Sequence, residues 1–182
     1  PASARPPIQS RGYGRDPQMV RIHRPGEVWP LTLDPRQQRL TKALCDLIVP
    51  EQEGAPSASA VGVPEFLDEW VSAPYPEQAA DRSLLLDGLD WMDAESRRLF
   101  LTGFEALDTA KQTHVCERFA DPAKAAGIHP DAAKFFKRFR DLAFGGYVTT
   151  AEGMKALGYT GNIPLSSFEG PPPEALRHLG LV

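Results

Sequence analysis

The chain has 182 residues, of which 42% are hydrophobic, and it carries a formal net charge of −4 with a pI near 5.6. This length suffices for one hydrophobic core, so we expect a single domain, and the acidic balance argues against a nucleic-acid-binding protein, which would show a basic stripe. No apolar run approaches the ~18 residues that a membrane-spanning helix needs, so we expect no transmembrane segment.

Residues 1–30 are rich in proline and show little apolar periodicity. Such a segment cannot bury enough apolar surface to order itself, so we expect an extended arm that lies over another surface. Tyr13 and Trp29 are its large amphipathic side chains. The chain begins at Pro1 rather than at a methionine, from which we expect that an N-terminal piece has been removed.

Apolar residues at helical spacing continue through most of the remaining sequence, and no segment predicts a strand. Caps and prolines place the ends of the expected helices. The predicted helices cover about 35–48, 64–73, 77–93, a weaker segment 95–107, 109–119, and one from about 131 onward. We therefore predict an all-α fold, a single compact helical domain of about six to seven helices. It spans 31–163, between the N-terminal arm 1–30 and an irregular C-terminal tail, 164–182, with one last turn at 174–179.

Residues 135–162 combine an apolar helical stripe with closely spaced glycines and tyrosines. We expect the helix to break at Gly145-Gly146 and a short second helix to follow, before Gly158-Tyr159-Thr160-Gly161-Asn162. Two interpretations fit these groups equally well. They are tight turns with positive φ and tyrosines packed as lids, or they form a docking surface for a partner.

The sequence contains no recognisable catalytic or metal-binding motif. Its four histidines are scattered, without the spacing of a zinc site. The acidic pair Asp90 and Asp93 and the basic cluster in 134–140 are typical of solvated helix faces. We therefore expect no catalytic, cofactor-binding or metal-binding residue in this chain.

Two cysteines, Cys45 and Cys116, are too few for a disulfide framework. They are either two buried thiols that behave as small hydrophobic residues or, in an oxidising compartment, one bridge. Both lie on predicted helices, which favours neither alternative.

Three segments together resemble the gluconate 2-dehydrogenase subunit 3 family: LCDLIVP (44–50), AVGVPEFLDEW (60–70) and FFKRFRDLAFGGYVTTAEGMKALGYTGN (135–162). The family pattern is a helix ending in ADxIIP, then GVPxFID, and finally FFxxLRDLxxxGYYTSxxGxxxLGYxGN. The resemblance covers about 31–165. Val148 departs from it, since many members carry a second tyrosine there.

The resemblance implies a small helical accessory subunit of a sugar or polyol dehydrogenase complex. Its partner would be a flavin-dependent large subunit of the glucose-methanol-choline type that binds FAD, often with a c-type cytochrome as electron acceptor. Members usually carry a twin-arginine signal and are exported to the periplasm with the large subunit bound, which fits a removed N-terminus. In that oxidising compartment a Cys45–Cys116 bridge and two free thiols are equally expected.

We therefore expect a non-catalytic subunit that stabilises the flavoprotein and helps to export it. The alternatives are a chain that completes its partner's active site, with residues such as Tyr147, Tyr159 or Asn162, and a free-standing binding module. The residues expected at the interface are Tyr13, Trp29, Tyr147, Gly158, Tyr159 and Asn162.

Overall fold

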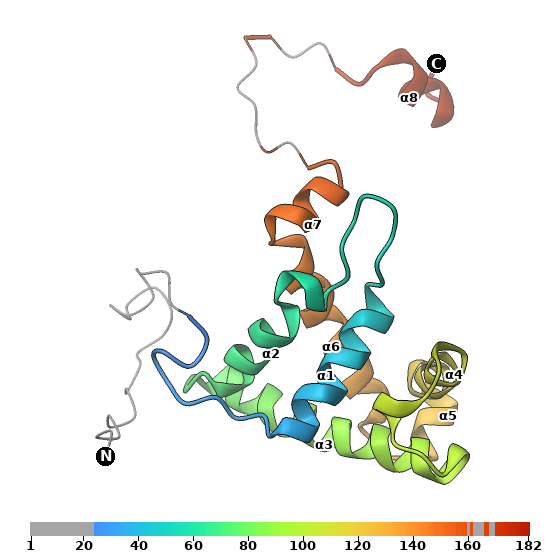
Figure 1. The fold of residues 1–182 in the computed structure, drawn as a ribbon. Coiled ribbons are helices and arrows are strands. Elements are labelled where there is room, and N and C mark those ends of the chain that lie inside the picture. The colour runs from blue at the N-terminus through green and yellow to red at the C-terminus, as the bar shows by residue number, and fades with distance from the viewer. Residues whose placement is uncertain (1–23, 160, 162–165, 168–169) are drawn as a thin grey trace.

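The computed structural model describes residues 24–159, 161, 166–167 and 170–182 (Figure 1). Within these residues it contains eight α-helices, two short 3-10 helices and no strand, so the prediction of an all-α fold is confirmed. The α-helices are α1 (Pro35–Ile48), α2 (Val63–Ser72), α3 (Pro76–Phe100), α4 (Thr109–Ala120), α5 (Pro122–Ala126), α6 (Ala132–Val148), α7 (Ala151–Ala156) and α8 (Pro173–His178). The 3-10 helices are η3 (Ser59–Val61) and η4 (Phe104–Ala106).

The first helix begins where its capping residues place it. The Asp34 carboxylate accepts a hydrogen bond from the backbone N–H of Gln37 (2.8 Å), and the Gln37 side chain accepts one from the N–H of Asp34 (3.0 Å). This reciprocal capping box satisfies two backbone N–H groups. Pro35, which has no N–H, occupies a first-turn position where an N–H would have no partner within the helix. The predicted start of this helix is therefore confirmed.

Helix α3 is longer than the sequence pattern predicts. It runs for 25 residues to Phe100, so the predicted separate helix over 95–107 is wrong, and only the 3-10 turn η4 forms there. The polar residues Glu95 and Ser96, which lie inside this longer helix, are both buried and hydrogen-bonded. The helix ends at Leu101, which adopts the left-handed conformation (φ 57°).

Helix α6 continues through Gly145 and Gly146 to Val148, so the predicted break at these glycines is wrong. Gly146 has a packing role instead, because a Cβ atom there would lie 2.7 Å from the Phe66 ring of α2. The glycine lets the two helices approach closely. Positive φ occurs further on, at Gly158 (66°) and Gly161 (74°), where the prediction of turns is correct.

The core is organised around α6, which packs against α1 to α5 and against α7. Its rings Phe135 and Phe139 lie edge to face at 5.9 Å between centroids, and Phe119 of α4 meets Phe135 at 6.0 Å. All three side chains are almost fully buried. Burial of these rings makes α6 the element on which the other helices converge.

Two buried carboxylates connect helices across this core. Asp81 of α3 accepts hydrogen bonds from Arg138 of α6 (2.6 and 2.8 Å) and from the indole N–H of Trp70 of α2 (2.8 Å). Burial alone would raise the pKa of Asp81, but these hydrogen bonds outweigh it and hold the pKa below its usual value.

Glu95 of α3 makes the second connection. Its carboxylate accepts hydrogen bonds from Arg98 and, across to α4, from Arg118 (2.6 Å). The hydrogen bond from Arg98 lowers the pKa of Glu95 and outweighs the opposing effect of burial, with Arg118 adding to it. Both carboxylates therefore stay ionised and paired inside the domain, where removal of one partner would leave an uncompensated charge.

Gly88 of α3 offers a direct test of the close packing on α6. A Cβ atom at this position would lie 2.0 Å from the Phe135 ring. Gly88→Ala should therefore lower the free energy of unfolding by about 1–3 kcal/mol through overpacking, despite the better helix propensity of alanine. Urea unfolding followed by circular dichroism measures the change.

Gly145 provides the matched control, because no described atom lies within 4 Å of its would-be Cβ. Gly145→Ala should stabilise the protein by up to ~1 kcal/mol, through helix propensity alone. Equal effects of the two substitutions would contradict the packing described for α3 and α6.

Candidate functional site

The described residues contain no group of three or more His, Cys, Asp or Glu side chains arranged to hold a metal ion. In the same part of the chain, no helix has both the length and the apolar character needed to cross a bilayer. Two concave surfaces stand out in the described part of the chain: a groove between α1 and α2, and a hollow at the end of α7.

The segment before α1 is fixed along α2 by carboxylates. Asp68, which is 3% exposed, accepts hydrogen bonds from the backbone N–H groups of Thr32 (3.1 Å) and Leu33 (3.0 Å). Glu69 accepts one from the N–H of Gly26 (2.8 Å). These contacts satisfy backbone N–H groups that have no partner within a helix. The end of the N-terminal arm is therefore packed as part of the domain.

Trp29 belongs to this fixed segment. Its ring meets Tyr75 edge to face at 5.9 Å, and its indole N–H donates to the backbone carbonyl of Glu69 (3.4 Å). The side chain is half-buried against its own domain. The interface role expected of Trp29 stays a prediction, and it would involve only the exposed part of the ring.

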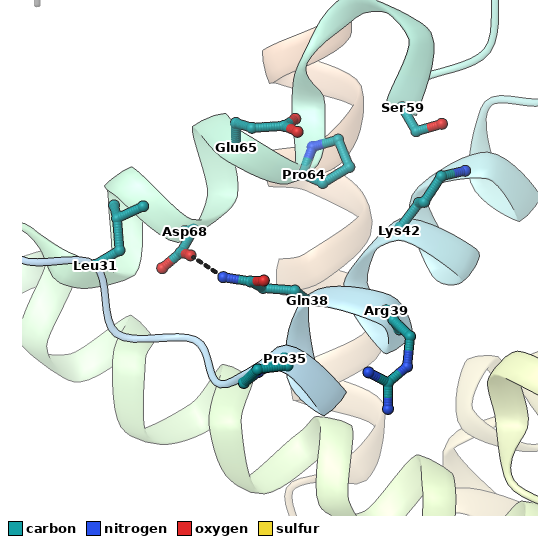
Figure 2. A pocket seen from close by; sticks show the side chains of 9 residues that line it. All are labelled: Leu31, Pro35, Gln38, Arg39, Lys42, Ser59, Pro64, Glu65 and Asp68. Atoms are coloured by element: carbon teal, nitrogen blue, oxygen red, sulfur yellow. Dashed lines mark hydrogen bonds between the residues drawn. The ribbon is translucent and has the colours of Figure 1, made fainter. Parts of the chain in front are cut away.

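The groove between α1 and α2 has a volume of about 550 Å³ (Figure 2). Arg39 and Lys42 project from α1 on one side, and Glu65 and Asp68 lie on α2 on the other. Its full lining is Leu31, Pro35, Gln38, Arg39, Lys42, Ser59, Pro64, Glu65 and Asp68. Of these residues, Glu65 and Asp68 could be recognised in the sequence as a carboxylate pair at helical spacing, for which a solvated helix face is the favoured interpretation. The groove itself could not be predicted, because it depends on how two helices pack against each other.

The basic side chains of the groove are already engaged. Arg39 pairs with Glu105 (2.9 Å) and Lys42 with Asp46 (2.7 Å). Gln38 donates across the floor to Asp68 (3.5 Å). The hydroxyl of Ser59, also in the lining, donates to the Asp46 carboxylate (2.8 Å). The arrangement connects helices through charge pairs and hydrogen bonds.

The hollow at the end of α7 is more apolar. It is lined by Val148, Thr149, Met154, Leu157, Gly158, Tyr159 and Gly161. Leu157 and Tyr159 are 58% and 61% exposed. Exposed apolar side chains beside a hollow are consistent with the interface role expected of this segment.

The position of Tyr159 follows from the way α7 ends. The N–H of Gly158 donates to the carbonyl of Lys155 (3.0 Å), and the N–H of Tyr159 donates to that of Met154 (2.9 Å). This is a Schellman motif, which needs the left-handed glycine and brings the residue after it toward Met154. Gly158 and Tyr159 are exposed, and their interface role stays a prediction.

Tyr147 is a core residue instead. Its side chain is 4% exposed, and its hydroxyl donates to the carbonyl of Pro56 (3.0 Å). The ring therefore offers no surface to a partner in this conformation. Tyr13 and Asn162, the remaining predicted interface residues, lie outside the described residues.

Cys45 on α1 and Cys116 on α4 are free, buried thiols in this structure. Burial raises the pKa of Cys116 to about 12 and that of Cys45 further still. Because the thiolate is the nucleophile, both side chains should be inert while the protein is folded.

A thiol count decides between two free thiols and the bridge. The structure predicts no reaction with a thiol reagent in the folded protein, and two reactive thiols after denaturation without reductant. The native-host protein should be used, so that its own redox compartment acts on it. An absence of thiols in the denatured, unreduced protein would establish the Cys45–Cys116 bridge and contradict the free thiols.

Comparison with known families gives one match. The family described as gluconate 2-dehydrogenase subunit 3 matches residues 35–165. Neither the comparison with curated proteins nor that with solved structures finds a match. The matched span starts with the first residue of α1 and ends after α7, before α8.

Proposed function

This chain belongs to the gluconate 2-dehydrogenase subunit 3 family, and we propose that it is the non-catalytic small subunit of a periplasmic, FAD-dependent sugar dehydrogenase complex. The family match over 35–165 carries the proposal, because it spans every helix of the packed domain. Its function in the complex is to stabilise the catalytic flavoprotein and to help export it.

The structural roles of the motif residues support a scaffold rather than a reaction centre. Asp68, in the second motif segment, fixes the segment before α1 through its hydrogen bonds to the N–H groups of Thr32 and Leu33. Gly146 permits the close approach of Phe66, and Tyr147 is buried against Pro56. Gly158 caps α7. Each of these residues has a role in folding, which supports the proposal that the chemistry lies in another chain.

The partner in this proposal is a large subunit of the glucose-methanol-choline type, and the FAD binds there. A c-type cytochrome would accept the electrons. A twin-arginine signal on the small subunit would direct the assembled pair to the periplasm. The exposed apolar residues around the hollow of α7 are consistent with a chain that works in contact with a larger protein.

Purification of the tagged chain from the periplasm of its native host tests this proposal. We expect a flavoprotein to co-purify in fixed ratio, with a flavin absorbance spectrum and sugar-dependent reduction of an artificial electron acceptor. Deletion of the small subunit should remove the flavoprotein from the periplasm. Recovery of the chain alone, together with normal export of the dehydrogenase in the deletion strain, would contradict the proposal.

Tyr159→Ala separates the scaffold from a chain that completes the partner's active site. The scaffold proposal predicts that any loss of turnover follows a loss of assembly, since the exposed ring contacts protein rather than substrate. Lost turnover in a fully assembled, FAD-loaded complex would instead assign Tyr159 to the active site.

A further inference from the structure

Exposed apolar side chains gather toward the C-terminal end of the described chain. Of the nine large hydrophobic residues exposed in the described part, five lie between residues 157 and 182. They are Leu157, Tyr159, Leu179, Leu181 and Val182. They fall in two groups, one at the end of α7 and one at the end of α8, and each group is a candidate interaction surface.

Three of these residues, Leu179, Leu181 and Val182, directly follow helix α8, which stands apart from the helical domain (Figure 1). None of its residues is buried. Its end is nevertheless well formed: the N–H of Gly180 donates to the carbonyl of Arg177 (3.1 Å), and that of Leu181 donates to Leu176 (2.9 Å). This second Schellman motif gathers Leu176 and Leu181 on one side of the helix end.

A helix of this size is not stable by itself. It has six residues, whereas isolated helices shorter than ~12–15 residues are marginal in water. Most helical stability in proteins comes from packing of an apolar face. Helix α8 therefore needs a surface that covers Leu176, Leu179 and Leu181.

In this structure the chain's own domain does not supply that surface, because no residue of α8 is buried. Gly170 and three consecutive prolines precede α8, and Pro172 has polyproline dihedrals (φ −62°, ψ 149°). Such a run is a stiff spacer that holds the next element away from the previous one.

A second copy of the chain is also a poor candidate. At 1.5 Å per residue, α8 is only about 9 Å long. A symmetric pair of such helices would bury far less than the ~1,200 Å² of a stable interface. The cover for α8 must come from a larger protein.

We propose that α8 is a docking helix, which binds in an apolar groove of the dehydrogenase subunit while the hollow of α7 contacts the same subunit. This inference rests on the proposed function and identifies the surface through which the small subunit binds the dehydrogenase subunit. Two linked contacts give the complex a higher affinity than either contact alone, because the second binding event becomes intramolecular. Since α8 lies beyond the span matched by the family, its side chains would select the particular dehydrogenase.

The test compares variants of the full chain for binding to the purified FAD-loaded dehydrogenase subunit. The double variant Leu179→Ser/Leu181→Ser removes two exposed apolar anchors. We expect it to bind ~10–100-fold more weakly, as expected when buried anchors are lost. The matched control, Glu174→Gln/Arg177→Gln, changes charges on the same helix and should bind like the wild type.

Thermal melting of the free chain should be the same for the wild type and both variants, because these side chains contribute no burial to the domain. Unchanged affinity of the leucine variant would overturn the docking role of α8 and leave the proposed function intact. Failure of the wild type itself to bind any FAD-loaded dehydrogenase subunit would overturn the proposed function and this inference together.

Discussion

The whole domain depends on close approach to the buried helix α6 from two sides. Phe135 of α6 lies against the bare backbone of Gly88 on α3, and Phe66 of α2 lies against Gly146 on α6. A side chain at either glycine would push a helix outward, because protein interiors leave no space for an added methyl group. With α2 and α3 held against α6, the Asp81–Arg138 pair and the Phe119–Phe135–Phe139 cluster can form. The groove beside α2 and the hollow beyond α6 are consequences of the same arrangement.

Local sequence signals predicted the helical class and the start of α1, and they failed where tertiary packing decided. A Gly-Gly pair is a strong local signal for a break, yet α6 absorbs Gly145 and Gly146 because the approach of Phe66 requires a glycine inside the helix. Gly158 gives the same local signal and does end a helix. The two cases differ in what packs against each glycine, and that information comes from the partner helix rather than from the residue itself. The continuity of α3 likewise depends on tertiary contacts, since Glu95 inside this helix is paired with Arg98 and with Arg118 of α4.

The tyrosines predicted at the interface differ in burial for a related reason. Tyr147 and Tyr159 have similar glycine-rich surroundings, and both were expected at an interface. Because α6 continues, Tyr147 falls four residues after Ala143 and eight after Phe139, on the buried stripe. Tyr159 follows the cap of α7 and remains exposed. The family resemblance and a docking role for Tyr159 could be inferred from the sequence, but the exposed surface at α8 could not, since an apolar residue is a core residue by default until its neighbours are placed.

The chain is a helical domain with exposed apolar side chains toward its C-terminal end. The central claim of the proposal is that these surfaces bind a flavin-dependent dehydrogenase. Amide hydrogen exchange of the chain, alone and in the reconstituted complex, tests this claim most directly. The account predicts fast exchange in α8 of the free chain, strong protection of α7 and α8 in the complex, and little change in α4 and α5. Protection confined to α4 and α5, or no change anywhere in the presence of the dehydrogenase, would contradict it.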